Sequence, residues 1–131
     1  MNKMIYQSTR LNPPEILCSE EYCGYKFYVL NLGTHPCAYV QIPKGDKLFE
    51  LTYDDIYKKY DIDCHGGLTY TYSKLSSVEE AGWFIGWDYA HCGDYCGYES
   101  CQAFEDQKWS TEEICFECKE VIDQIVVINA Q

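Results

Sequence analysis

The chain contains few basic residues. Of its 131 residues only 10 are lysine or arginine, against 21 that are aspartate or glutamate, and the formal net charge is −11. A protein that binds DNA or RNA needs a positive surface to meet the phosphates, so this balance argues against direct contact with nucleic acid. A strongly acidic protein is instead attracted to basic partners. We therefore expect a protein partner with a basic surface.

Long apolar runs are also missing. The first residues, MNKMIYQSTRLNPP, hold no apolar core of the kind that a signal peptide needs, and no later run is long enough to span a membrane. We therefore expect a cytoplasmic protein in a reducing compartment. The nine cysteines are an odd number. In that compartment thiols bind metal or pack as small hydrophobic groups, and a disulfide framework is not expected.

The sequence lacks the motifs of the common catalytic frames. It has no GxxxxGK[ST] loop for phosphates and no GxSxG turn for a nucleophilic serine. Cysteine and histidine are adjacent at Cys64-His65 and His91-Cys92, but neighbours on a strand point to opposite faces. A binding protein is therefore favoured over an enzyme.

Composition and periodicity predict the fold. Hydrophobic residues make up 47% of the chain and aromatics 16%, which is typical of one globular domain, residues 1–131. β-Rich stretches predict strands at 25–30, 37–42, 68–72 and 83–87, the last as the central strand, with 14–18 as an edge strand or connector. A short helix is expected at 52–60, with Thr52 as its cap.

The clearest helix is at the C-terminus. Ser110 and Glu113 form a capping box at its start. An apolar stripe follows at three- and four-residue intervals: Ile114, Cys118, Val121, Ile122 and Ile125. The predicted fold class is α+β, an antiparallel sheet of four or five strands with this amphipathic helix packed on it.

The candidate site lies in residues 82–98, GWFIGWDYAHCGDYCGY. An apolar strand ends there in a turn that carries Asp88, His91 and Asp94 at three-residue steps, and His65 comes from the segment DIDCHGG (61–67). Two imidazoles and two carboxylates suit zinc, or manganese or iron with added waters. The sequence therefore predicts a metal site at His65, Asp88, His91 and Asp94. The alternative is a buried polar network, in which Asp88 and His91 hydrogen-bond the turn backbone.

The cysteines leave further alternatives open. Cys64 and Cys92 each adjoin a histidine, and either thiolate in place of a carboxylate would favour zinc more strongly. A second thiolate site could combine Cys92, Cys96 and Cys101 with Cys115 or Cys118 of the helix; its spacing is looser than that of a zinc knuckle. Cys118 falls on the apolar stripe, so packing is its expected role.

Four segments resemble a widespread family of short phage and prophage proteins. They are CAYVQIPKG (37–45), YDDI (53–56), DCHGGLTY (63–70) and GWFIGWDYAHCGD (82–94). That family has an HGGLT segment and a later W-φ-G-φ-D-x-A-H-x-G-D segment, where φ is apolar. The matching positions are His65, Gly66, Gly67, Asp88, His91, Gly93 and Asp94. The first 35 residues and residues 96–108 depart from the pattern.

The resemblance implies a mobile-element protein that acts inside a bacterial cell. Several small acidic phage proteins inhibit RNA-guided nucleases by occupying their nucleic-acid channels. We therefore expect a zinc-binding anti-CRISPR protein that binds a type II CRISPR nuclease and blocks nucleic-acid loading. The alternative function is a small metal-dependent hydrolase, or a protein that binds or sequesters nucleotides, with the same four predicted ligands at its centre.

Overall fold

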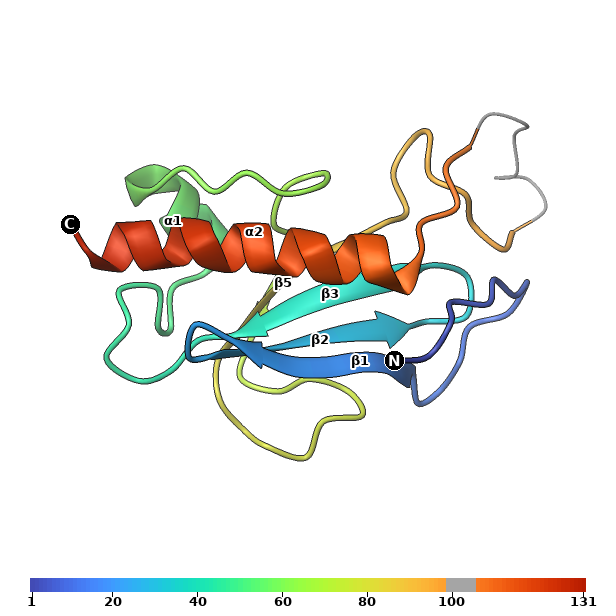
Figure 1. Ribbon diagram of the computed structural model, residues 1–131, viewed down its shortest axis with the longest axis horizontal. Helices are drawn as coiled ribbons and strands as arrows, with labels where there is room; N and C mark the ends of the chain where they lie inside the picture. Colours follow the sequence, from blue (N-terminus) through green and yellow to red (C-terminus); the bar gives the residue numbers. More distant parts are fainter. Residues whose placement is uncertain (99–105) are drawn as a thin grey trace.

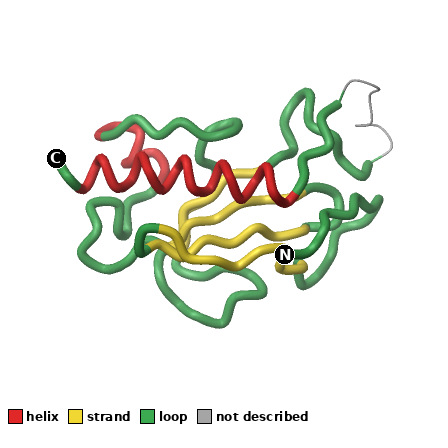
Figure 2. The backbone as a smooth tube through the Cα atoms, in the orientation of Figure 1, coloured by secondary structure: helices red, strands yellow, loops and turns green. Residues whose placement is uncertain are grey.

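The computed structural model describes residues 1–98 and 106–131 and contains one antiparallel sheet under a long helix (Figures 1 and 2). The sheet has five strands in the order β1-β2-β3-β5-β4, and all neighbours are antiparallel. The strands are β1 (Glu15–Tyr22), β2 (Tyr25–Asn31), β3 (Pro36–Gln41), β4 (Tyr70–Tyr72) and β5 (Phe84–Asp88). The predicted α+β class is confirmed.

The order of the strands corrects one expectation. The strand predicted at 83–87 is β5, and it pairs with β3 on one side and β4 on the other. It therefore lies inside the sheet, but the middle position belongs to β3. The prediction of a central β5 is wrong because β1 extends over eight residues and adds a full strand beyond β2.

Helix α2 (Thr111–Asn129) covers one face of the sheet. Its capping box is formed as predicted, since the Ser110 side chain accepts from the amide of Glu113 and the Glu113 carboxylate accepts from the amide of Ser110. The five stripe residues are all fully buried, and Cys118 packs as expected. Each large aliphatic side chain buried in this way stabilises the fold by about 1.5–3 kcal/mol.

Shorter elements complete the two layers. Helix α1 (Tyr53–Lys59) is capped by Thr52 as predicted and buries Ile56 in the core under α2. The opposite face of the sheet is covered by Leu75 and Val78 from the loop between β4 and β5. No helix in residues 1–98 or 106–131 combines the length and the hydropathy that a membrane crossing requires.

Strand β1 contains one irregularity in its pairing with β2. Its register against β2 shifts between Ile16 and Cys18, so that Leu17 has no partner of its own. An extra residue of this kind is a β-bulge, and it changes the face to which the following side chains point. Leu17 and Cys18 are consecutive, yet both are buried in the core beneath α2.

Candidate functional site

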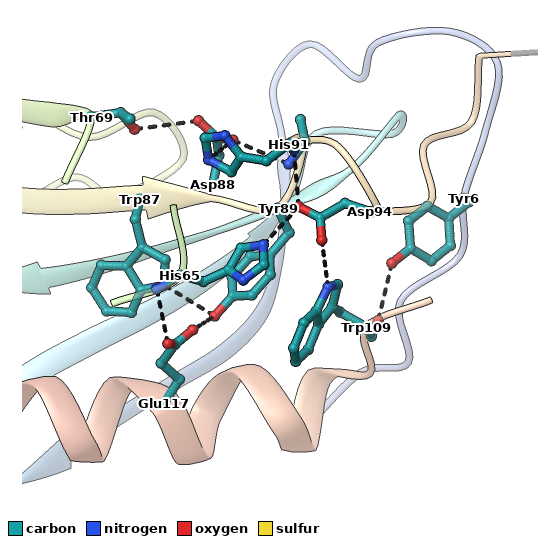
Figure 3. A network of polar contacts seen from close by, with 11 residues as sticks. Tyr6, His65, Thr69, Trp87, Asp88, Tyr89, His91, Asp94, Trp109 and Glu117 are labelled. Atoms are coloured by element: carbon teal, nitrogen blue, oxygen red, sulfur yellow. Dashed lines mark hydrogen bonds and ion pairs between the residues drawn. The ribbon is translucent and has the colours of Figure 1, made fainter. Parts of the chain in front are cut away.

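The two sequence motifs meet beside the first half of α2 (Figure 3). His65 lies in the loop between α1 and β4, and Asp88 is the last residue of β5. His91 and Asp94 follow in the turn after β5. The structure therefore brings together residues from two segments that the sequence predicted to form one site.

Asp94 is the most enclosed of the four predicted ligands, with 5% of its surface exposed. Its Oδ2 accepts from Nε2 of His65 at 2.7 Å and from the backbone amide of His91 at 2.9 Å. Its Oδ1 accepts from the indole Nε1 of Trp109 at 2.8 Å. Since a carboxylate only accepts, Nε2 of His65 carries the proton in this contact. Three donors satisfy Asp94, as a buried carboxylate requires.

Asp88 and His91 form the second pair. Oδ1 of Asp88 accepts from the amide of Ala90 at 3.1 Å, and Oδ2 accepts from the hydroxyl of Thr69 at 3.3 Å. The Nε2 atom of His91 lies 3.2 Å from Oδ1 of Asp88. This approach is close enough for an ion pair, but its geometry is not that of a hydrogen bond, and the buried Nε2 has no hydrogen-bond partner among residues 1–98 and 106–131.

Gly66 allows the two segments to approach each other. Its φ is +70°, in the left-handed region that glycine tolerates best, and a side chain there would overlap the imidazole of His91. The first glycine of the HGG segment is therefore required by its contact with His91 of the second motif.

A further set of contacts ties both motifs to α2. The hydroxyl of fully buried Tyr89 donates to Oε1 of Glu117 and accepts from Nε1 of Trp87 at 3.0 Å. Oε2 of Glu117 accepts from the amide of His65 at 2.9 Å. The His65 ring stacks on Tyr89, with centroids 4.7 Å apart and planes 7° apart. Burial, with the Glu117 contact second, raises the pKa of Tyr89, which keeps its hydroxyl protonated as a donor.

The predicted ligands are thus neighbours that form two histidine–aspartate pairs. Their ligand atoms do not form a group of three or more that all lie within 4.8 Å of one another. As placed, they belong to a hydrogen-bonded network, which was the alternative interpretation of the motif. Metal binding by His65, Asp88, His91 and Asp94 stays a prediction.

A different group in the described part of the chain could hold a metal ion. Ligand atoms of Cys18, Glu20 and Cys115 all lie within 4.8 Å of one another. Cys18 and Cys115 are each 4% exposed, and Glu20 is exposed. The predicted second thiolate site paired the helix cysteines with Cys92, Cys96 and Cys101, of which Cys101 lies outside the described residues. The thiol next to Cys115 instead comes from β1, and no local spacing could have indicated it.

The outer face of α2 is acidic. The helix carries five carboxylates, Glu112, Glu113, Glu117, Glu120 and Asp123, and a single cation, Lys119. A groove of about 480 Å³ follows this face. Its lining residues, here called the acidic groove, are Trp109, Glu112, Glu113, Phe116, Glu117 and Glu120. Phe116 is 66% exposed among these carboxylates.

A separate polar cleft of about 230 Å³ has Asp88 in its lining. Arg10, His35 and Thr69 line it together with aromatic side chains. Burial lowers the pKa of His35 below its ordinary value of 6.5, although Asp88 acts in the opposite direction. The cleft therefore holds one permanent cation, one carboxylate and an imidazole that favours its neutral form.

No protein-family model, curated protein or solved structure matches this chain. The resemblance to phage proteins therefore stays a prediction, and the function has to be argued from charge, contacts and burial.

Proposed function

We propose that this protein inhibits a host defence effector by binding one of its basic surfaces through the acidic groove of α2. The observation that carries the proposal is the placement of Phe116, an exposed aromatic ring surrounded by glutamates on a rigid helix. The resemblance to phage proteins suggests the partner, a type II CRISPR nuclease, whose nucleic-acid channel is basic. Occupation of that channel would block nucleic-acid loading.

Charge and apolar area in the acidic groove both favour a basic protein surface. Glu112, Glu113 and Glu120 lie three or four residues from Phe116, so they share its side of the helix. Their charges attract lysine and arginine side chains and accelerate association. Phe116 supplies apolar area that a charged rim alone lacks, and aromatic residues are enriched at the centres of interfaces. Together they favour a basic protein surface as the occupant of the groove.

The network behind the groove supports the same function. Glu117 lines the groove and also holds Tyr89 and His65. The motif loops therefore fix the orientation of α2 from behind, on the side away from solvent. In this proposal the motif residues are a scaffold, and the outer face of the helix makes the contact.

Zinc is part of the proposal as a structural ion at His65, Asp88, His91 and Asp94. Its support is the chemistry of the donor set and the buried Nε2 of His91, which lacks a hydrogen bond. For one ion to take all four residues, Nε2 of His65 would exchange its proton and its hydrogen bond to Asp94 for a metal bond. Elemental analysis of wild type beside His91→Ala tests this, and a zinc content unchanged by the substitution would reject it.

The binding proposal is tested with a purified type II CRISPR nuclease, with and without its guide RNA. We expect the protein to bind the guide-free nuclease and to reduce DNA cleavage when it is added before the guide. The double variant Glu112→Gln/Glu120→Gln removes two groove charges and should weaken binding by about 2- to 30-fold, since each exposed ion pair contributes about 0.2–1 kcal/mol.

The matched control is Glu21→Gln/Glu79→Gln, which makes the same change of charge outside the groove. Glu79 lies in the loop between β4 and β5, whose Leu75 and Val78 cover the face of the sheet opposite α2. Equal weakening by both double variants would show a general effect of net charge and would reject the groove. Absence of binding to the guide-free nuclease would reject the proposed partner.

The polar cleft favours a second candidate function, a protein that binds or hydrolyses nucleotides. Arg10 offers a guanidinium for phosphate, and Asp88 belongs both to the cleft and to the four predicted ligands. This function predicts nucleotide binding that Arg10→Gln weakens about tenfold, because a charge-assisted contact is lost. Failure to bind or turn over any of a panel of nucleotides would exclude it.

A further inference from the structure

We propose that Cys18, Glu20 and Cys115 bind one zinc ion where strand β1 meets helix α2. These residues lie outside the acidic groove and outside the two motifs, so the inference does not depend on the proposed function. Two thiolates and a carboxylate are typical zinc ligands, and sulfur ligands disfavour magnesium, calcium and manganese.

The strand supplies two of the ligands because of its bulge. After the register shift, Cys18 pairs with Val29 and Glu20 pairs with Phe27, and both partners are buried in the core beneath α2. Directly paired residues share a face, so Cys18 and Glu20 both point toward the helix. Without the extra residue at Leu17, the alternation of the strand would turn these two side chains to the other face.

The helix supplies the third ligand. Cys115 lies near the start of α2 on its buried side, and its sulfur lies within 4.8 Å of that of Cys18. Cys118 follows one turn later and is fully buried. It does not belong to the group whose ligand atoms all lie within 4.8 Å of one another, so it is not counted among the ligands.

The distances fit a tetrahedral ion after a small movement. With bonds of about 2.0–2.3 Å, two ligands on one zinc lie about 3.3–3.8 Å apart. The three ligand atoms are already within 4.8 Å of one another, so closure needs shifts of about 1 Å or less. Glu20 is exposed at the edge of the sheet, which gives the ion a path from solvent. A water molecule from that side would complete the fourth position.

The proton balance makes the binding dependent on pH. A free cysteine has a pKa of about 8.5, so a thiol is mostly protonated near neutral pH until a metal binds it. When zinc binds, each S–H bond is replaced by an S–Zn bond and each proton leaves to solvent. Because two protons are released per ion, the affinity for zinc should rise by about 100-fold for each unit by which the pH increases, as long as the pH stays below the thiol pKa values. Lys119 lies near Cys115 and favours its thiolate.

The test uses the tag-free, reduced chain of residues 1–131 titrated with Co²⁺, which gives thiolate charge-transfer absorption, and then with Zn²⁺ as competitor. We expect one thiolate-bound Co²⁺ per chain, counted from that absorption, and its loss in Cys18→Ser and in Cys115→Ser. Glu20→Gln should weaken binding by about tenfold or more, by analogy with the loss of supporting groups at metal sites. Glu21→Gln is the matched control on the same strand, and Cys37→Ser is the control for a buried thiol elsewhere.

A second measurement does not depend on the folding of the serine variants. In wild type, Zn²⁺ should slow the alkylation of Cys18 and Cys115 and leave the rate at exposed Cys23 unchanged. The inference is overturned if the reduced chain takes up no Co²⁺, or if the absorption survives in both serine variants. It is also overturned if His91→Ala abolishes binding that Glu20→Gln leaves intact, or if Zn²⁺ does not protect the two thiols.

Discussion

Replacing Tyr89 by phenylalanine removes one oxygen atom from the centre of the network that links both motifs to α2. The hydroxyl donates to Glu117 and accepts from Trp87, and the tyrosine is fully buried, so the ring of phenylalanine fills the same space. The substitution therefore changes hydrogen bonding and leaves no large cavity.

The expected loss follows from the two contacts. A hydrogen bond to a charged group contributes about 1.5–3 kcal/mol, and an unpaired buried N–H costs about 1–3 kcal/mol. Trp87 is 1% exposed, so water does not readily replace the lost acceptor. Glu117 is only partly buried and retains the amide of His65, which reduces the cost at that end. We expect Tyr89→Phe to lower the free energy of unfolding by about 2–4 kcal/mol.

Urea unfolding followed by tryptophan fluorescence measures this change, with Tyr72→Phe as control. Tyr72 is 58% exposed, so its variant should stay within about 0.5 kcal/mol of wild type. A double-mutant cycle with Glu117→Gln should give a coupling of about 0.5–3 kcal/mol. A loss below about 0.5 kcal/mol for Tyr89→Phe, or no coupling, would refute the reasoning.

Three further predictions concern the same scaffold. Gly66→Ala should lower the free energy of unfolding by about 2 kcal/mol or more, because the new side chain overlaps His91 at a position that already has a left-handed φ. Gly93→Ala has open space at φ +93° and should cost only the backbone strain of about 1–2 kcal/mol. Equal losses for the two variants in urea unfolding would contradict this difference. Burial lowers the pKa of His35, so the unfolded chain binds more protons and stability should fall as the pH drops from 6.5 through that lowered pKa. The stability of His35→Gln should lack this fall at low pH. A profile of stability against pH identical to that of wild type would exclude His35 as its cause. Ser110→Ala should cost about 1 kcal/mol and lower the thermal midpoint by a few degrees, since it removes the cap of α2, and an unchanged midpoint would count against the cap.

The sequence predicted elements whose causes are local. The capping box at Ser110, the stripe of α2 and the cap at Thr52 are set by residues a few positions apart, and all are confirmed. The contact between the two motif segments was also predictable, because a buried strand delivers its exit loop to a fixed place.

The rest depends on pairing between distant segments. Glu117 was not predicted to hold Tyr89 and His65, because nothing in the spacing of the helix indicates which carboxylate faces the motif loops. The place of Cys18 next to Cys115 depends on a bulge in β1, and the apolar run Ile16-Leu17-Cys18 does not show where the extra residue is inserted.

The acidic groove of α2 is proposed to recognise a basic protein surface. The most direct measurement is the affinity of the wild-type chain for the guide-free type II nuclease as ionic strength rises. Between about 0.1 M and about 1 M salt the Debye length falls from about 10 Å to about 3 Å, which screens exposed charges. We expect a steep loss of affinity for the wild-type chain and a shallower loss for Glu112→Gln/Glu120→Gln. Affinity that is independent of salt, or equally dependent in both proteins, would contradict it.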